Sequence, residues 1–308
     1  MEKSIMKEFA IKSEIVAKND VLPNNFAIII GAMKCGTTSL WYYLSEHPQI
    51  AASKEKEVNF FVDEDRIVKG LLWYRSMWSW QPGNLIAMEA SPNYTRQPYR
   101  ANIAEKIAQV KDSQFKFIYI MRNPLARIES GITMRLQALE ADNLPVPSPE
   151  EVEINEDDIA ISQYAMQLNP YVEIFGHEKL HLLLLEDLQE DPQTELSRIC
   201  QFLGVDSNHQ FQNLDIVRNN RETLNLNPFV SKIRHKPPVR FLLENFTSPR
   251  LRQKLRGRLS RKEPLDFKLT EQQKAMVLNR LQADLLTLEA DYGINVQGKW
   301  GIPIVSQK

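Results

Sequence analysis

Disulfides and long apolar runs are the features that the sequence most clearly lacks. The 308 residues contain two cysteines, Cys35 and Cys200, which are too few for a secreted scaffold held together by disulfides. Residues 1–20 mix Lys and Glu with short apolar stretches, unlike a signal peptide or a membrane anchor. We therefore predict a cytoplasmic protein without a transmembrane segment.

Neither sign of charge is in excess. The chain has 38 Lys and Arg residues against 39 Asp and Glu residues, for a formal net charge of -1. This balance gives no overall attraction to nucleic acid or to an anionic membrane, so local clusters have to hold any anionic ligand. The length suits one main domain, which we place at residues 23–308, after an N-terminal tail at 1–22.

Apolar runs alternate with helical patterns along the chain. FAIIIG at Phe26–Gly31 predicts a strand, and the SLWYYLSEH that follows its loop has helical spacing. FKFIYIM at Phe115–Met121 repeats the arrangement, with Pro124 at the start of the next helix. This alternation predicts an α/β fold, a P-loop-like parallel sheet flanked by helices, with ligands at the carboxyl ends of the strands. The other predicted elements are helices at Leu125–Leu139, Ile159–Phe175 and Gln193–Leu203, a strand at Leu180–Leu185, and a long helix between Thr270 and Gly293.

The loop after the first strand, GAMKCGTTS at 31–39, has the composition of a phosphate-binding loop. Between a strand and a helix, backbone N–H groups and the helix dipole converge on an anion. Glycine permits close approach of the backbone, hydroxyls add donors, and Lys34 supplies a positive charge. The predicted phosphate-binding residues are Lys34, Cys35, Gly36, Thr37, Thr38 and Ser39.

The nucleotide-triphosphate P-loop is the main alternative for this segment. Its pattern, G-x-x-x-x-G-K-[ST], has lysine directly after the second glycine, where this sequence has Thr37. The lysine lies instead two residues before Gly36, and the next strand ends in Met121-Arg122 rather than in an Asp suited to magnesium. A P-loop nucleotide kinase or NTPase is therefore disfavoured but stays an alternative, as does a non-catalytic nucleotide-binding module.

A second phosphate clamp is predicted after the strand at Phe115–Met121. Arg122 stands at the strand end, and Ser130 lies in the second turn of the next helix. An arginine fork grips a phosphate through two hydrogen bonds, and a hydroxyl on the adjacent helix can close the site. Taken alone, Arg122 fits equally well a pairing with an acid at the sheet edge.

Together these motifs resemble the sulfotransferases that use 3′-phosphoadenosine 5′-phosphosulfate (PAPS). The family's 5′-phosphosulfate loop, K-x-G-T-T-[SW]-L, is matched by KCGTTSL at 34–40, and its 3′-phosphate site by Arg122 with Ser130. The resemblance extends from Phe26 to Trp300 and implies the sulfotransferase fold. Further segments similar to the glycan-modifying branch are KEVNFF at 56–61, EASPNY at 89–94, YAMQL at 164–168 and EDL at 186–188.

The resemblance implies transfer of a sulfuryl group from PAPS to an acceptor hydroxyl or amine, which leaves adenosine 3′,5′-bisphosphate. In-line transfer needs stabilisation of the charge that accumulates on the departing oxygen, and we assign that role to Lys34. Glu57 occupies the position of the family's catalytic base, whereas the charged run KEKE at 54–57 taken alone favours a surface carboxylate. This mechanism requires no metal.

The acceptor is not identified by the sequence. Where the family has His in the KEVHFF segment this chain has Asn59, and where it often has Lys in the E-K-[ST]-P segment this chain has Ala90. Those positions face the acceptor in heparan-type enzymes, so a smaller or less charged acceptor is expected here. A small molecule, a lipid, a saccharide and a carrier-bound hydroxyl all fit, and no oligomeric state is indicated.

Two charged segments stand apart from these motifs. Leu144–Asp158 is rich in Pro and Glu and is predicted to be an exposed acidic loop. Residues 231–262 are strongly basic, and in the resembling family a loop in this region folds over the nucleotide. Arg256 and Arg258 are therefore candidates for binding the nucleotide, with a solvated helical face as the simpler interpretation.

Overall fold

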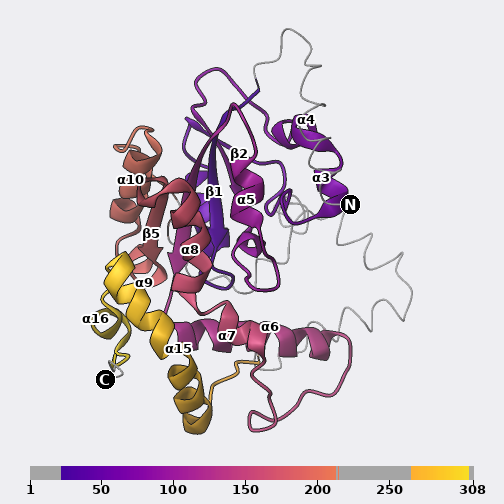
Figure 1. Ribbon diagram of the computed structural model, residues 1–308, viewed down its shortest axis with the longest axis vertical. Helices are drawn as coiled ribbons and strands as arrows, with labels where there is room; N and C mark the ends of the chain where they lie inside the picture. Colours follow the sequence, from indigo (N-terminus) through magenta and orange to yellow (C-terminus); the bar gives the residue numbers. More distant parts are fainter. Residues whose placement is uncertain (1–21, 213, 215–264, 305–308) are drawn as a thin grey trace, which may run out of the picture. The chain divides into compact units, whose positions relative to one another are not determined.

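The computed structural model describes residues 22–212, 214 and 265–304 (Figure 1). Contacts divide the chain into two units, Met1–Gln212 with Phe267–Lys308, and Asn213–Asp266. Almost all of the second unit lies outside the described residues, so the fold below is that of the first unit. The sequence predictions that also fall outside them are the tail, apart from its last residue, and the basic tract at 231–262 with Arg256 and Arg258.

A five-stranded parallel sheet confirms the predicted α/β class. Its strands are β1 (Asn25–Gly31), β2 (Ile50–Ala52), β3 (Ile86–Ala90), β4 (Gln114–Met121) and β5 (Leu180–Leu184), in the order β2-β3-β1-β4-β5. β1 and β4 are buried over nearly their whole length, as expected of central strands covered on both faces. The chain passes from β1 to β2, returns to β3, and then crosses to β4 on the other side of β1. Ligands of open α/β sheets bind where the strand order reverses in this way.

Helices connect the strands and continue after β5. Between β1 and β4 the chain forms α2 (Thr37–Leu44), α3 (Glu64–Ile67), α4 (Gly70–Arg75), the 3-10 helix η2 (Pro92–Tyr94) and α5 (Ile103–Ala108). From β4 to β5 it forms α6 (Pro124–Ala141), α7 (Glu156–Ala160), α8 (Tyr164–Phe175) and the 3-10 helix η3 (His177–Lys179). After β5 come α9 (Leu185–Glu190), α10 (Pro192–Leu203), α15 (Glu271–Tyr292) and α16 (Val296–Trp300).

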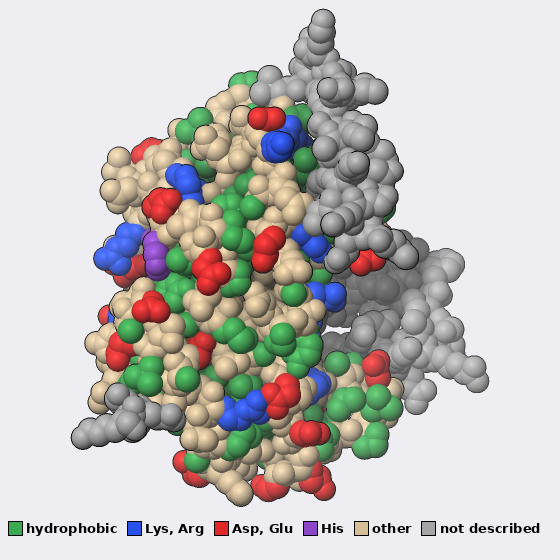
Figure 2. Space-filling view, viewed as in Figure 1, with side chains coloured by type: hydrophobic (Ala, Val, Ile, Leu, Met, Phe, Trp, Pro, Cys, Tyr) green, Lys and Arg blue, Asp and Glu red, His purple; other side chains and the backbone are tan. Residues whose placement is uncertain are grey.

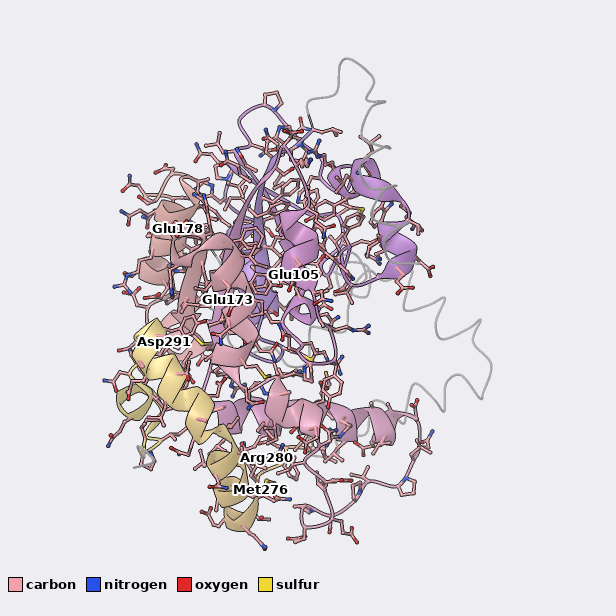
Figure 3. The ribbon with its side chains drawn as sticks, viewed as in Figure 1. Glu105, Glu173, Glu178, Met276, Arg280 and Asp291 are labelled. Carbon is pink, nitrogen blue, oxygen red and sulfur yellow. The ribbon has the colours of Figure 1, made fainter. Side chains whose placement is uncertain are left out.

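The helices are arranged so that α15 meets both α7 and α8. In Figure 1, α5 and α8 lie in front of the sheet, and α6, which follows β4 in the sequence, runs across the lower part of the view. Figure 3 labels Glu173 on α8 and Asp291 on α15, exposed residues of two helices that run beside each other. Arg280 of α15 pairs with Glu156 at the start of α7. The long helix α15 is thus part of the same unit as the sheet.

Two predicted segments differ from the structure between α6 and α8. The helix expected at Ile159–Phe175 is divided between two helices, since α7 ends at Ala160 and α8 begins at Tyr164. The acidic loop expected at Leu144–Asp158 ends in the first turns of α7, where Asn155 forms a capping box. Asp158 is buried rather than solvated, and it accepts a 2.9 Å hydrogen bond from Arg135. A charge that looked surface-exposed therefore stabilises the junction of α6 and α7.

The described part of the surface has no large region of one charge in view. Figure 2 shows acidic and basic side chains interspersed across the viewed face. Within residues 22–212 and 265–304, no helix combines the length and the apolar character needed to cross a membrane. Cys35 and Cys200 are both buried free thiols. The cytoplasmic location stays a prediction.

Candidate functional site

Three of the sequence-predicted residues lie at the carboxyl ends of the strands of the sheet. All five strands run in the same direction, so the loops that follow them meet at the carboxyl edge. Lys34 follows β1, Glu57 follows β2, and Arg122 follows β4. Three residues that are far apart in the sequence are therefore presented on the same side of the molecule.

The loop after β1 leaves the start of α2 open to a ligand. Gly36 is the N-cap of α2, with a φ of 91°, and it has no side chain to accept a hydrogen bond from the first turn. Within the described residues, the N–H groups of Thr37, Thr38 and Ser39 have no hydrogen-bond acceptor. A Cβ at position 36 would lie 2.7 Å from Leu185 Cδ1, so the loop cannot take a larger residue without a shift. Such a helix start suits an anion.

Lys34 and Cys35 have different environments in this loop. Lys34 has a φ of 69° and is half-buried, and its Nζ lies 3.6 Å from Met134 Sδ. The Cys35 side chain is fully buried, 3.6 Å from Tyr164 Oη, and its N–H donates to the Ala32 carbonyl. Burial raises the pKa of the Cys35 thiol to about 11, so it is protonated at neutral pH. Lys34 is thus the loop's charged group, while Cys35 packs the loop against the interior.

Arg122 is in direct contact with this loop. Its Nη1 donates a hydrogen bond of 3.4 Å to the carbonyl oxygen of Lys34. In the described part of the chain Arg122 has no ion pair with an acid, which was the alternative for this residue. Ser130 lies half-buried on α6, two turns after Arg122. The structure therefore brings Arg122, the charged group of the second predicted site, into contact with the loop of the first.

Tyr164, at the start of α8, contacts both the loop after β1 and the backbone of Arg122. Its hydroxyl donates a 2.8 Å hydrogen bond to the Arg122 carbonyl and lies beside the Cys35 thiol. The first turn of α8 is held by Asp284 of α15, whose carboxylate accepts hydrogen bonds from the N–H groups of Ala165 and Met166. Desolvation by burial raises the pKa of Asp284 to about 6, although these hydrogen bonds oppose the rise. The sequence motifs gave no signal for Asp284.

Asn123 braces the turn that carries Arg122. Its Oδ1 accepts hydrogen bonds from two N–H groups in the first turn of α6, which makes it the N-cap of that helix. Its backbone N–H donates to Glu186 Oε1 at 2.9 Å, and its Nδ2 donates to the Trp300 carbonyl at 3.3 Å. The C-terminal end of the described chain therefore supports the second clamp, which the sequence motifs did not indicate.

Glu57 lies in a loop of unusual backbone conformation. Glu57 has a φ of 66° and Asn59 a φ of 49°, and both residues are half-buried. The Glu57 carboxylate forms a 2.6 Å ion pair with Lys56, and Asn59 Oδ1 accepts a 3.3 Å hydrogen bond from Asn93 of η2. Ala90, at the end of β3, is completely buried. Glu57 is thus held at the carboxyl edge, two strands away from β1.

Comparison with known proteins identifies the family. Residues 25–230, more than half of the chain, match the family model described as a sulfotransferase domain. The chain belongs to the sulfotransferase-domain family. The match confirms the family that the sequence motifs resemble. In this sulfotransferase-domain protein, the matched region contains all five strands of the sheet and the residues of both predicted anion sites.

Named relatives and one solved structure agree with this assignment. The sulfotransferase-domain protein is 28% identical over 188 residues to heparan sulfate glucosamine 3-O-sulfotransferase 5 of Mus musculus, covering 58% of this chain and 53% of the relative. It is 33% identical over 189 residues to heparan sulfate glucosamine 3-O-sulfotransferase 3B1 of the same species, covering 58% and 46%. The chain thus spans about half the length of these curated relatives. A sulfotransferase from Alicyclobacillus acidocaldarius has a TM-score of 0.52 at 24% identity, over 86% of this chain and 96% of that one, which shows a shared fold.

Proposed function

We propose that this protein transfers a sulfuryl group from PAPS to a hydroxyl of its acceptor. The observation that carries the proposal is the contact between the Arg122 guanidinium and the Lys34 carbonyl. It joins two anion sites that follow the neighbouring strands β1 and β4. A ligand with phosphate groups at two positions on one nucleoside can reach both sites at once. Family membership supports the same donor.

The residues at the edge fit such a donor. The open amides at the start of α2 and the Lys34 ammonium suit the 5′-phosphosulfate end. The Arg122 guanidinium and the Ser130 hydroxyl suit the 3′-phosphate, because an arginine fork binds phosphate through paired, charge-assisted hydrogen bonds. Arg256 and Arg258 stay candidates for the same end of the nucleotide and lie outside the described residues.

The proposed transfer is an in-line displacement at sulfur. The acceptor oxygen forms a bond to sulfur while the bond from sulfur to the 5′-phosphate oxygen breaks, and no electrons are gained or lost overall. Lys34 and the α2 amides stabilise the negative charge left on the departing oxygen. Glu57 takes the proton of the acceptor hydroxyl. This division of roles accounts for a cation after β1 and a carboxylate after β2 on the same edge.

For the acceptor, we propose a saccharide hydroxyl with little charge around it. The names of the relatives refer to heparan sulfate glucosamine, a saccharide. In this chain the two positions hold Ala90, which is buried, and Asn59, which accepts a hydrogen bond from Asn93. Neither side chain carries a positive charge. A surface hollow of about 650 Å³ is lined by the segment after η2 and by the start of α7, and within it Arg96 is already paired with Asp157. Arg96 is therefore less available to a strongly anionic chain, and Arg100 is the other cation that lines the hollow.

Mass spectrometry of acceptor mixtures tests the proposed function. The protein is incubated with PAPS in three separate reactions, which contain neutral oligosaccharides, heparan sulfate fragments or a metabolite extract. We expect a product heavier by one sulfuryl group and an equal amount of adenosine 3′,5′-bisphosphate, with the neutral oligosaccharides favoured. If ATP with Mg²⁺ raises the melting temperature and adenosine 3′,5′-bisphosphate does not, the protein is a kinase or NTPase instead.

Replacing Asn123 with Ala should weaken the second clamp and α6 together. Loss of the N-cap should lower the free energy of unfolding by about 1 kcal/mol. Loss of the bond to the Trp300 carbonyl should also lower the affinity for adenosine 3′,5′-bisphosphate, measured by calorimetry. Asn155→Ala is the matched control, because Asn155 caps α7 in the same way and does not contact Arg122. Equal nucleotide affinity in the two variants would contradict the bracing role.

A further inference from the structure

Glu89 is a carboxyl group inside the core of the sheet. It is the fourth residue of β3, and its side chain is 0% exposed. An unpaired carboxylate is strongly disfavoured in such a place, so buried carboxyl groups need several hydrogen-bond donors. The neighbours of Glu89 therefore indicate what the group is for.

Three hydroxyl groups donate to the Glu89 carboxylate. Tyr74 Oη, from α4, and Tyr94 Oη, from η2, donate to Oε1 at 2.6 and 3.3 Å. Ser91 Oγ donates to Oε2 at 2.6 Å. Both oxygens of the carboxylate are thus satisfied by hydroxyl protons, which orients each hydroxyl with its lone pairs pointing away from Glu89.

Two of these hydroxyls bind the loop that carries Glu57. Ser91 Oγ accepts a hydrogen bond of 3.0 Å from the Asn59 N–H, and Tyr94 Oη accepts one of 3.3 Å from the Phe61 N–H. Tyr74 makes no such bond to the loop. Each oxygen of the Glu89 carboxylate therefore connects, through one hydroxyl, to one backbone amide of the segment at 56–61.

The segment at 56–61 needs external support to keep its conformation. Glu57 and Asn59 both have positive φ values, and such residues persist where their surroundings fix them. Besides the two hydroxyls, Arg66 of α3 supports the segment by donating a 2.5 Å hydrogen bond to the Val58 carbonyl. The anchors lie directly after Glu57, so they determine where its carboxylate is presented.

We propose that Glu89 is a positioning residue that fixes the Glu57 loop through Ser91 and Tyr94. The inference rests on the proposed function, in which Glu57 takes the acceptor proton. Glu89 itself does not touch the substrates. It keeps two hydroxyls oriented so that their lone pairs face the amides of Asn59 and Phe61.

The test uses two variants that break the connection at different points and one control. Glu89→Gln keeps the shape of the side chain but puts an NH₂ group against a hydroxyl proton. Ser91→Ala keeps the carboxylate and removes the acceptor of the Asn59 N–H. Tyr74→Phe is the control, because it also removes a donor to Glu89 but leaves both links to the loop.

The hydrogen-exchange rate of the Asn59 amide reports whether the loop is held in place, and its measurement requires no enzymatic activity. In Glu89→Gln and Ser91→Ala we expect the Asn59 amide to exchange about tenfold faster than in the wild type, the effect of losing one partly buried hydrogen bond. With the acceptor that mass spectrometry identifies, turnover should fall by about tenfold or more in both. The melting-temperature rise caused by adenosine 3′,5′-bisphosphate should stay the same, since the loop after β1 is not touched. At pH 8, which favours ionised Glu89, Tyr74→Phe should be close to the wild type in all three.

The pH dependence adds a readout that a purely structural role would not give. Desolvation by burial raises the pKa of Glu89 to about 7, against the lowering effect of its hydroxyl donors and of Arg66. The other titratable groups facing it are Tyr74 from α4, Tyr94 from η2 and Tyr171 from α8. Because the ionised form orients the hydroxyls, the protection of the Asn59 amide should increase as pH rises from 6 to 8. In Glu89→Gln it should not change with pH.

Unchanged exchange and turnover in both Glu89→Gln and Ser91→Ala would overturn the inference. So would an equal loss in Tyr74→Phe, because Glu89 would then act only on the packing of the core. Should Glu89→Gln fail to fold, Ser91→Ala still decides the question. If no acceptor is sulfated, the proposed function fails, yet the exchange data still show whether Glu89 holds the loop.

Discussion

Replacing Lys34 with Ala should lower the turnover of sulfuryl transfer by about 10² to 10³-fold, the range found when one donor to a developing oxyanion is removed. Lys34 is the charged side chain of the loop after β1, and it lies next to the open start of α2. Its charge matters most when the bond from sulfur to the 5′-phosphate oxygen breaks. The loss should therefore appear mainly in kcat, with a smaller change in the affinity for adenosine 3′,5′-bisphosphate.

The measurement for Lys34→Ala is steady-state transfer followed by mass spectrometry of the sulfated product. Lys111→Ala is a suitable control, because Lys111 is an exposed lysine that precedes β4, at the opposite edge of the sheet. The control should retain wild-type turnover. Full activity in Lys34→Ala would remove Lys34 from the chemistry.

The second large effect is expected for Glu57→Gln, which should lose about 10² to 10⁴-fold in turnover, the usual contribution of a general base. Gln has nearly the same shape but cannot take the acceptor proton. The binding of adenosine 3′,5′-bisphosphate should not change, because Glu57 follows β2 whereas the anion sites follow β1 and β4.

The neighbouring Glu55 gives a matched control for Glu57. Both lie in the charged run KEKE at 54–57, and Glu55 is the more exposed of the two and pairs with Arg66. Glu55→Gln should keep wild-type turnover. If the two variants lose activity equally, the effect comes from the charge of the run, and Glu57 is not the base.

Much of the fold could be predicted from the sequence where apolar periodicity was strong. β1, β4 and β5 are mostly apolar, with Lys116 inside β4 and His181 inside β5, and the predicted strand at Leu180–Leu185 differs from β5 by one residue. β2 and β3 were not predicted. β2 has three residues, which is too short for a pattern, and β3 contains Glu89, whose charge argues against a buried strand. Its burial is explained only by hydroxyls that come from three other positions of the chain.

The candidate site was predictable as far as local motifs define it. The loop at 34–39 and Arg122 are local signals, and the structure brings them into contact. The supports of the site come from distant residues: Asp284 holds the start of α8, and Trp300 holds Asn123. Such pairs depend on how α15 and α16 pack, which no local pattern in one sequence reveals.

The central claim is that one nucleotide occupies both anion sites, and calorimetry with two ligands tests it most directly. Adenosine 3′,5′-bisphosphate and adenosine 5′-monophosphate differ only by the 3′-phosphate. The wild type should bind the bisphosphate about 10 to 100-fold more tightly, the range for hydrogen bonds to a charged group. Arg122→Ala should bind both ligands with nearly equal affinity. If Arg122→Ala keeps the full preference for the bisphosphate, Arg122 does not hold the 3′-phosphate and the account is wrong.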